Sequence, residues 1–178
     1  MNDYSDLVFM MGAMVLFSLF ANNVNDGIVR GSTLLTQVEV EYSAIAFGQT
    51  IIEQARSRSF DEITVPTDPD EEAIVGNTRL LGANGYPNGF TSPQAFGSDT
   101  GEIYPNFDDF DDYHELSLVR ESAYGDYSIT AVVEYLDEDD FSTASSSRTN
   151  VKRLNVRVDH PNLLNPIIIP YVLSLIHI

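Results

Sequence analysis

The chain has 178 residues, which is enough for one compact domain plus an appendage. Its formal net charge is −18, from 27 acidic and 9 basic residues, so its surface repels nucleic-acid phosphates and anionic lipid headgroups. Nucleic acid is therefore excluded as an expected partner. The chain has no cysteine, which excludes disulfide bonds and cysteine-ligated metal sites.

An uncharged apolar segment runs from Leu7 to Ala21. It is apolar on every helical face, which is typical of a membrane span or of a helix inside a bundle. At 1.5 Å per residue it covers about 23 Å, so it needs Tyr4 and Val24 at its edges to cross a tilted or thinned bilayer. No basic residue precedes Arg30, and we therefore expect that a basic leader has been removed from a mature chain. The alternative is a buried core helix.

The large apolar side chains of this segment are the candidates for a membrane helix that later packs in a filament core. They are Leu7, Val8, Phe9, Met10, Met11, Met14, Val15, Leu16, Phe17, Leu19 and Phe20. Gly12 and Ala13 between them permit close approach of a second helix. A permanent membrane anchor is the competing interpretation.

A weak stretch follows the apolar segment, at Asn22, Asn23, Asn25 and Gly27. Asn and Gly are poor helix formers, so we expect the helix to be interrupted or melted near 22–27, which would let a stalk extend. The helix is expected to resume over 32–59. Its apolar residues recur at three- and four-residue steps and predict an amphipathic stripe: Leu35, Val38, Tyr42, Ile45, Ile52 and Ala55.

The rest of the chain predicts a β-rich head. Residues 64–106 are rich in Gly, Pro and Asn and predict a long loop region with one short strand near Thr78–Leu81. Period-two alternation over 127–135 and 153–158, with further strands at 116–120 and 167–174, predicts an antiparallel β-meander over 115–175. The expected fold class is α+β, with a long N-terminal helix packed on this sheet. We expect two parts, a stalk over 1–31 and a globular head over 32–178.

Three local stretches carry a resemblance to type IV pilins and pseudopilins. AFGQTIIEQARSRSFDEI (46–63) is similar to the end of the stalk in prepilin-type proteins. GEIYPNFDDFDDYHEL (101–116) resembles the acidic turn of MSHA-like minor pilins, and VKRLNVRVDHP followed by IIIPYVLS resembles their closing strands. The resemblance implies a subunit that is stored in the inner membrane and assembled by pilus machinery into a filament of its own copies.

The N-terminus departs from the pattern of that family. This chain has Ser5 where the family carries a Glu that neutralises the N-terminal ammonium of a neighbouring subunit. An uncompensated charge in an apolar filament core is costly, so a carboxylate is still expected to serve. We expect the N-terminal charge contact to involve Met1 together with Asp3 or Asp6.

An acidic cluster, Asp108, Asp109, Asp111 and Asp112, is the strongest chemical signal in the sequence. Four carboxylates this close repel one another unless a cation or solvent relieves them. One interpretation is a Ca²⁺ site, because Ca²⁺ accepts irregular oxygen-rich loops. The other is a solvated acidic turn whose Phe107, Phe110 and Tyr113 pack into the head. Apart from this possible Ca²⁺, no cofactor is expected.

The sequence shows no nucleophile elbow, phosphate-binding glycine loop or zinc-protease motif, so no enzymatic activity is expected. The function predicted is that of a structural subunit of an extracellular, type IV pilus-like filament at the cell surface, with cell adhesion as its expected role. Two alternatives remain, a minor pilin or pseudopilin of a secretion apparatus, and a membrane-anchored binding module.

Overall fold

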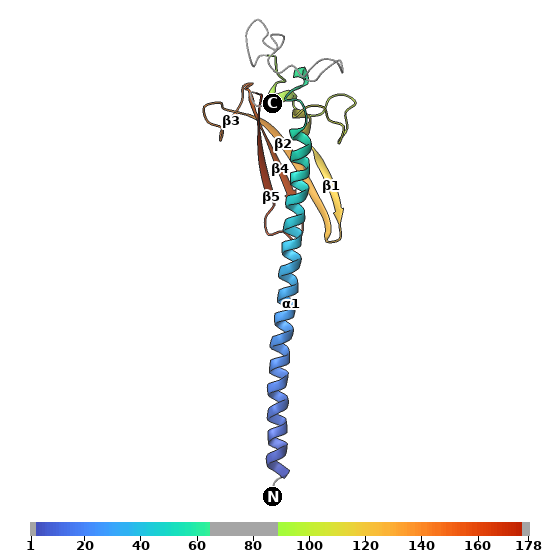
Figure 1. The fold of residues 1–178 in the computed structure, drawn as a ribbon, viewed down its shortest axis with the longest axis vertical. Helices are drawn as coiled ribbons and strands as arrows, with labels where there is room; N and C mark the ends of the chain where they lie inside the picture. The colour runs from blue at the N-terminus through green and yellow to red at the C-terminus, as the bar shows by residue number, and fades with distance from the viewer. Residues whose placement is uncertain (1–2, 65–88, 176–178) are drawn as a thin grey trace. The chain divides into compact units, whose positions relative to one another are not determined.

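The computed structural model describes residues 3–64 and 89–175. The chain divides into two compact units, Met1–Val40 and Glu41–Ile178, and the helix α1 (Asp3–Arg56) contributes to both. α1 has 54 residues, about 80 Å at 1.5 Å per residue. The predicted α+β fold is confirmed: within the second unit, the end of α1 packs on an antiparallel sheet (Figure 1).

The predicted interruption at Asn22, Asn23, Asn25 and Gly27 is wrong for this structure, because α1 is helical without a break through all four. Each weak helix former costs at most about 1 kcal/mol relative to alanine. A break would require a second helix nucleation, which is unfavourable, whereas continuation adds one hydrogen bond per residue. The helical residues on both sides therefore extend the helix through these positions. Melting of these residues during assembly stays a prediction.

The face of α1 that packs on the sheet differs from the predicted stripe. Ile52 and Ala55 are buried as that stripe requires, but Leu35, Val38, Tyr42 and Ile45 are exposed. The buried residues of α1 are instead Val40, Ala44, Gly48, Ile51, Ile52 and Ala55, with Phe47 half-buried. The ring of Phe47 meets that of Tyr127 edge-on at 5.1 Å between centroids. Both sides of the helix carry apolar residues, so periodicity alone did not identify the packed side.

α1 ends at Arg56, three residues before the predicted end, where the Ser57 hydroxyl donates to the carbonyl of Gln54 at 2.7 Å. Short 3₁₀ turns follow at η1 (Glu62–Thr64) and η2 (Pro93–Ala95). A third, η3 (Asp111–Tyr113), precedes the sheet. The strand predicted at Thr78–Leu81 lies outside the described residues.

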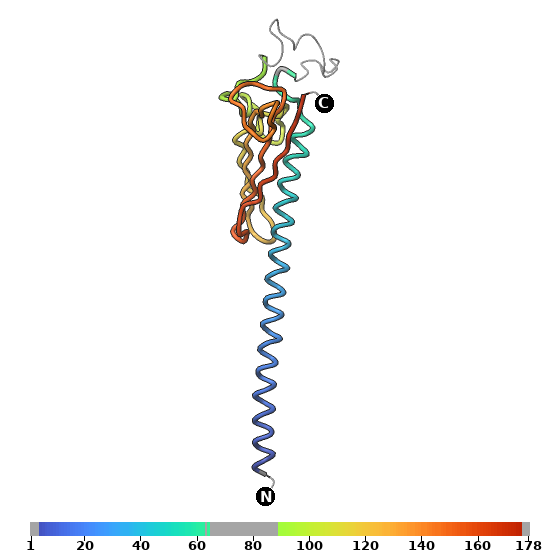
Figure 2. The backbone as a smooth tube through the Cα atoms, turned by 90° about the vertical axis from the view of Figure 1, so that its left-hand side faces the viewer, coloured from blue at the N-terminus to red at the C-terminus, as the bar shows by residue number. Residues whose placement is uncertain are grey.

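The sheet order is β1-β2-β4-β5, with β3 paired to β2, and every pairing is antiparallel. Its strands are β1 (Ser117–Ser122), β2 (Gly125–Leu136), β3 (Ala144–Ser145), β4 (Val151–Asp159) and β5 (Ile167–Ser174). This confirms the predicted meander and adds β3 inside the loop between β2 and β4. Figure 2 shows residues 41–56 of α1 running along one side of the strands.

The inner face of the sheet follows the predicted alternation. On β2, Tyr127, Ile129, Ala131, Val133 and Tyr135 are buried, and the residues between them are exposed or half-buried. Their partners on β4 are Val158, Val156, Leu154 and Lys152, opposite Ile129, Ala131, Val133 and Tyr135. Lys152 is therefore a charged residue in an otherwise apolar row of β4 side chains that face the core.

Candidate functional site: an uncovered helix and a buried charge cluster

The first candidate site is the uncovered surface of α1 near the N-terminus. All eleven large apolar residues predicted for a membrane or filament helix, from Leu7 to Phe20, are between 57% and 83% exposed. Soluble monomers rarely expose contiguous apolar patches larger than a few hundred Å². A surface of this kind needs lipid or other helices around it.

α1 is also long and apolar enough to cross a membrane. Residues 4–24 contain a single charged residue, Asp6, and would span about 32 Å as a helix. This matches the roughly 30 Å hydrocarbon core of a bilayer. The helix is therefore compatible with insertion into a membrane.

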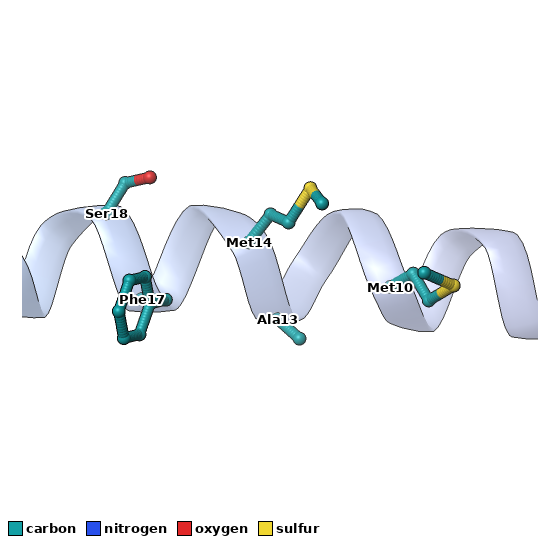
Figure 3. Close-up of a pocket in the computed structure, with 5 residues that line it drawn as sticks. All are labelled: Met10, Ala13, Met14, Phe17 and Ser18. Carbon is teal, nitrogen blue, oxygen red and sulfur yellow. The ribbon is translucent and has the colours of Figure 1, made fainter.

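A shallow apolar hollow lies on the side of this helix, lined by Met10, Ala13, Met14, Phe17 and Ser18 (Figure 3). Ala13 has the shortest apolar side chain of the group, which also contains the long side chains of Met10, Met14 and Phe17. Small residues beside large ones let a neighbouring helix insert a side chain and approach closely. The hollow can therefore accept a side chain of a second helix.

The apolar surface continues along α1 beyond Gly27. Leu35, Val38 and Tyr42 are 68%, 62% and 74% exposed, and Leu34 and Ile45 are also exposed. Their spacing of three and four residues places them on one helical face, opposite the face of Ala44, Ile51 and Ala55. α1 thus carries an exposed apolar face over 34–45, in addition to the buried face over 44–55 that the sheet covers.

The predicted N-terminal charge contact lies at the limit of the described residues. Met1 is outside them, Asp3 is the first residue of α1, and Asp6 is exposed in the second turn. The predicted contact between neighbouring subunits therefore stays a prediction.

The second candidate site is a buried ionic cluster around Lys152 in the head. The Lys152 side chain is fully buried, and its ammonium donates to Asp111 Oδ1 at 2.6 Å, to Asp61 Oδ2 at 2.9 Å and to the Phe60 carbonyl at 2.7 Å. The three ammonium protons are all used. Burial of an unpaired charge is very costly, so two carboxylates and a carbonyl are what allow a lysine to stand in the core.

Aromatic rings enclose this cluster. Lys152 Nζ lies 4.6 Å from the ring centroid of Phe60, 5.2 Å from that of Phe96 and 5.3 Å from that of Tyr135. Aromatic faces attract a cation and exclude water at the same time. The Tyr135 hydroxyl donates to the Thr91 carbonyl at 2.9 Å, and burial is the main reason that its pKa is raised.

Asp61 is held in place by its own hydrogen bonds. It accepts from the Thr91 backbone N–H at 3.0 Å and from the Thr91 hydroxyl at 3.2 Å, in addition to Lys152. Asp61 follows the end of α1, Asp111 belongs to η3 and Lys152 to β4. The cluster therefore joins three segments that are distant in the sequence.

The acidic cluster is folded inward and is not the solvated turn that one interpretation of the sequence predicted. Asp109, Asp111 and Asp112 are buried. Asp109 Oδ1 accepts the backbone N–H groups of Asp111 and Asp112, at 2.8 and 3.1 Å, and Asp112 Oδ2 accepts those of Asp108 and Asp109, both at 3.2 Å. The predicted packing of Phe107, Phe110 and Tyr113 into the head is confirmed. Burial of these three rings also removes the carboxylates between them from contact with water.

The protonation of Asp109 follows from this burial. Burial raises the pKa of Asp109 from 3.8 to about 9, and the nearby charge of Asp111 adds to the effect. Burial also raises the pKa of Asp111, although the charge of Lys152 opposes it. Asp109 is therefore a neutral acid near pH 7, and its side chain hydrogen-bonds to Asp111.

The predicted Ca²⁺ residues separate into two groups. Carboxylate oxygens of Asp108 and Asp112 lie with one of Glu102 within 4.8 Å of one another, a spacing that a metal ion can bridge. Asp109 and Asp111 are not members of this group, and Glu102 was missed because it lies outside the continuous acidic run, although in the same segment. Burial, followed by a hydrogen bond with Asp112, raises the pKa of Glu102 to about 7. Protonation of Glu102 would relieve the repulsion among these carboxylates, as a bound cation would.

The sequence matches no protein-family model, and neither a curated protein nor a solved structure shows significant similarity to the chain.

Lys152 and Asp61 were not predicted as site residues, although one signal was available. Lys152 is the single lysine of the sequence, and the alternation that puts Leu154 and Val156 inward also puts Lys152 inward. A lysine at an inward position requires buried anionic partners. Asp61 and Asp111 are 91 and 41 residues away, so their identity required the fold.

Proposed function

We propose that this chain is a structural subunit of an extracellular filament of the type IV pilus kind, stored in a membrane and assembled through bundling of its N-terminal helices. The observation that carries the proposal is the uncovered apolar surface of α1 from Leu7 to Phe20. It supports burial in lipid before assembly and against copies of the same helix afterwards.

The energetics favour such a transfer. Complete burial of one large apolar side chain contributes about 1.5–3 kcal/mol relative to water, so eleven of them keep the helix out of water. Lipid and a helix bundle provide similar apolar surroundings, and packing of small residues against large ones then decides between them. Ala13, Gly12 and the hollow beside Met14 support helix–helix packing.

The second apolar face of α1 distinguishes assembly from simple anchoring. A membrane anchor requires an apolar helix only as long as the bilayer. The exposed face made by Leu35, Val38 and Tyr42 lies outside the part of the helix that a bilayer would cover. In an anchored monomer, this apolar face would be exposed to water. In a filament, the same face would pack against neighbouring helices, which favours a subunit over a membrane-anchored binding module.

The test compares the full chain with a chain that lacks residues 1–21. Detergent removal from the purified full chain is expected to produce filaments visible by electron microscopy, whereas the truncated chain should remain a soluble monomer. Filaments formed by the truncated chain would contradict the role of the helix. A full chain that only inserts into added lipid vesicles as a monomer would favour the anchored binding module.

The share of this chain in sheared surface fibres separates a major from a minor pilin. A chain that makes up most of the fibre mass would be a major pilin, and a chain present in trace amounts would be a minor one.

A further inference from the structure

The charge cluster of the head has the composition and geometry of a site for covalent bond formation. A lysine amine and a carboxyl group condense to an amide when they are held in contact without water, because proximity replaces the entropy cost of bringing them together. Lys152 Nζ and Asp111 Oδ1 are 2.6 Å apart, both side chains are at most 4% exposed, and three aromatic rings surround the amine.

We propose that Lys152 and Asp111 form an intramolecular isopeptide bond that covalently links β4 to the turn η3. The proposal concerns a modification of the head and does not depend on filament formation. Asp61 acts as the positioning residue that also relays a proton, since its carboxylate contacts Lys152 Nζ at 2.9 Å and is fixed by Thr91.

The reaction balances without an oxidant or a co-reactant. Lys152 first transfers a proton to the carboxylates, which produces a neutral amine and the neutral acid of Asp111; an apolar site favours this pair over two separated charges. Nζ then attacks Cγ of Asp111, and the N–C bond forms. The second amine proton passes through Asp61 to the departing hydroxyl. The C–O bond breaks, and one water leaves.

Asp109 is placed to assist this step. Its carboxylic acid hydrogen-bonds to the side chain of Asp111, and its Oδ1 is fixed by the backbone N–H groups of Asp111 and Asp112. A donor aimed at the reacting carbonyl stabilises the negative charge that develops on its oxygen. The alternative outcome is a permanent ion pair, in which Lys152 keeps its three hydrogen bonds and no water is lost.

Intact-mass spectrometry of the denatured full chain, purified in detergent, tests the proposal directly. The expected mass is lower than the sequence mass by one water. Because Lys152 is the only lysine, a protease specific for lysine should leave the denatured chain uncut, whereas a free amine would allow cleavage into two pieces. The full sequence mass together with cleavage after Lys152 would overturn the proposal.

Trypsin digestion identifies the peptide whose carboxyl group is bonded to Lys152. Asp61 lies in the peptide 59–79 and Asp111 in 80–120, whereas Lys152 lies in 149–153 when cleavage after it is blocked. A branched peptide of 80–120 with 149–153 is expected. A branch to 59–79 would overturn the assignment to Asp111.

Two variants serve as controls. Lys152→Arg keeps a cation in the cluster but has no amine to acylate, so it should show its full sequence mass. Asp111→Asn should lose either nothing or one ammonia, because its side chain releases ammonia in place of water. Loss of one water from Asp111→Asn would place the bond on another carboxylate and contradict the proposal.

Discussion

At the scale of single residues, Lys152 joins the Phe60 carbonyl and the carboxylates of Asp61 and Asp111 in the core of the head. Its removal by Lys152→Met leaves Asp61 and Asp111 buried without their cation. Breaking a buried ion pair from one side costs about 3–5 kcal/mol. We expect a loss of at least this size in the free energy of unfolding, because the variant also cannot form the amide proposed above. Thermal unfolding of the full chain in detergent, followed by near-ultraviolet circular dichroism, measures it.

The control for this prediction is Arg157→Met. Arg157 and Asp159 form a pair of 2.7 Å, but both side chains are more than 40% exposed. Exposed ion pairs contribute about 0–1 kcal/mol, so the free energy of unfolding of this variant should be close to that of the parent chain. Equal losses from the two variants would show that Lys152 is not held by the cluster as described.

The raised pKa values of the buried carboxyls predict a pH dependence. Asp109 has a pKa of about 9 in the folded chain and 3.8 as a free side chain, and Glu102 about 7 against 4.5. The folded state therefore binds more protons than the unfolded state between these values, and stability falls as pH rises. The contribution is fully present below about pH 4 and is lost as pH rises toward 9. We expect a melting temperature that decreases from about pH 5 to about pH 9.

Asp109→Asn tests the residue behind this pH dependence. The amide keeps an oxygen that can accept the backbone N–H groups of Asp111 and Asp112, and it cannot ionise. The decrease of the melting temperature with pH should therefore be shallower than in the parent chain. An unchanged slope would assign the effect to other carboxyls, such as Glu102.

At the scale of elements, the contact between α1 and the sheet depends on Gly48. A Cβ at this position would lie 2.7 Å from Ile169 Cδ1 and 3.4 Å from Val158 Cγ2. Gly48→Val should therefore destabilise the head by about 1–3 kcal/mol through overpacking. Ile169→Val removes the Cδ1 atom, so the double variant should recover part of the loss in a thermal unfolding experiment.

The matched control is Gly31→Val in the same helix, where no atom lies within 4 Å of an added Cβ. Since valine is a better helix former than glycine, this change should not destabilise the chain. A loss as large as that of Gly48→Val would show that the effect comes from helix propensity and not from packing.

The outer apolar face of α1 gives a second prediction at this scale. Val38→Glu should leave the head folded, because Val38 is 62% exposed, but should reduce filament formation by placing a charge in the expected helix bundle. Val119→Glu on β1 is the control, with a similar exposure of 64%. Electron microscopy after detergent removal compares the two, and equal filament yields would contradict a role of this face in assembly.

At the scale of the whole molecule, the net charge of −18 opposes assembly. Copies brought together repel one another over a distance set by the Debye length, about 30 Å at 0.01 M salt and about 8 Å at 0.15 M. The yield of sedimentable filaments should therefore increase with salt over this range. A yield that falls with salt would indicate that attraction between opposite charges, and not apolar burial, drives assembly.

Much of the fold followed from local patterns in the sequence. We predicted the helix over Leu7–Ala21, the alternation on β2 and β4 and the bounds of β5. These predictions were possible because the 3.6-residue period of a helix and the two-residue period of a strand are properties of a single element. The uninterrupted helix through Asn22–Gly27 was missed, because composition reports the cost of each weak residue and not the cooperativity of the helix around it.

The sequence by itself determined the two helical regions on either side of 22–27, the four long strands and the apolar character of Leu7–Ala21, because these depend on neighbours in the chain. Only the tertiary structure decided which side of α1 packs on the sheet, since α1 carries apolar residues on both sides, exposed over 34–45 and buried over 44–55. It alone decided that Asp61 and Asp111 meet Lys152, because those contacts span 91 and 41 residues and depend on how β4, η3 and the end of α1 pack together.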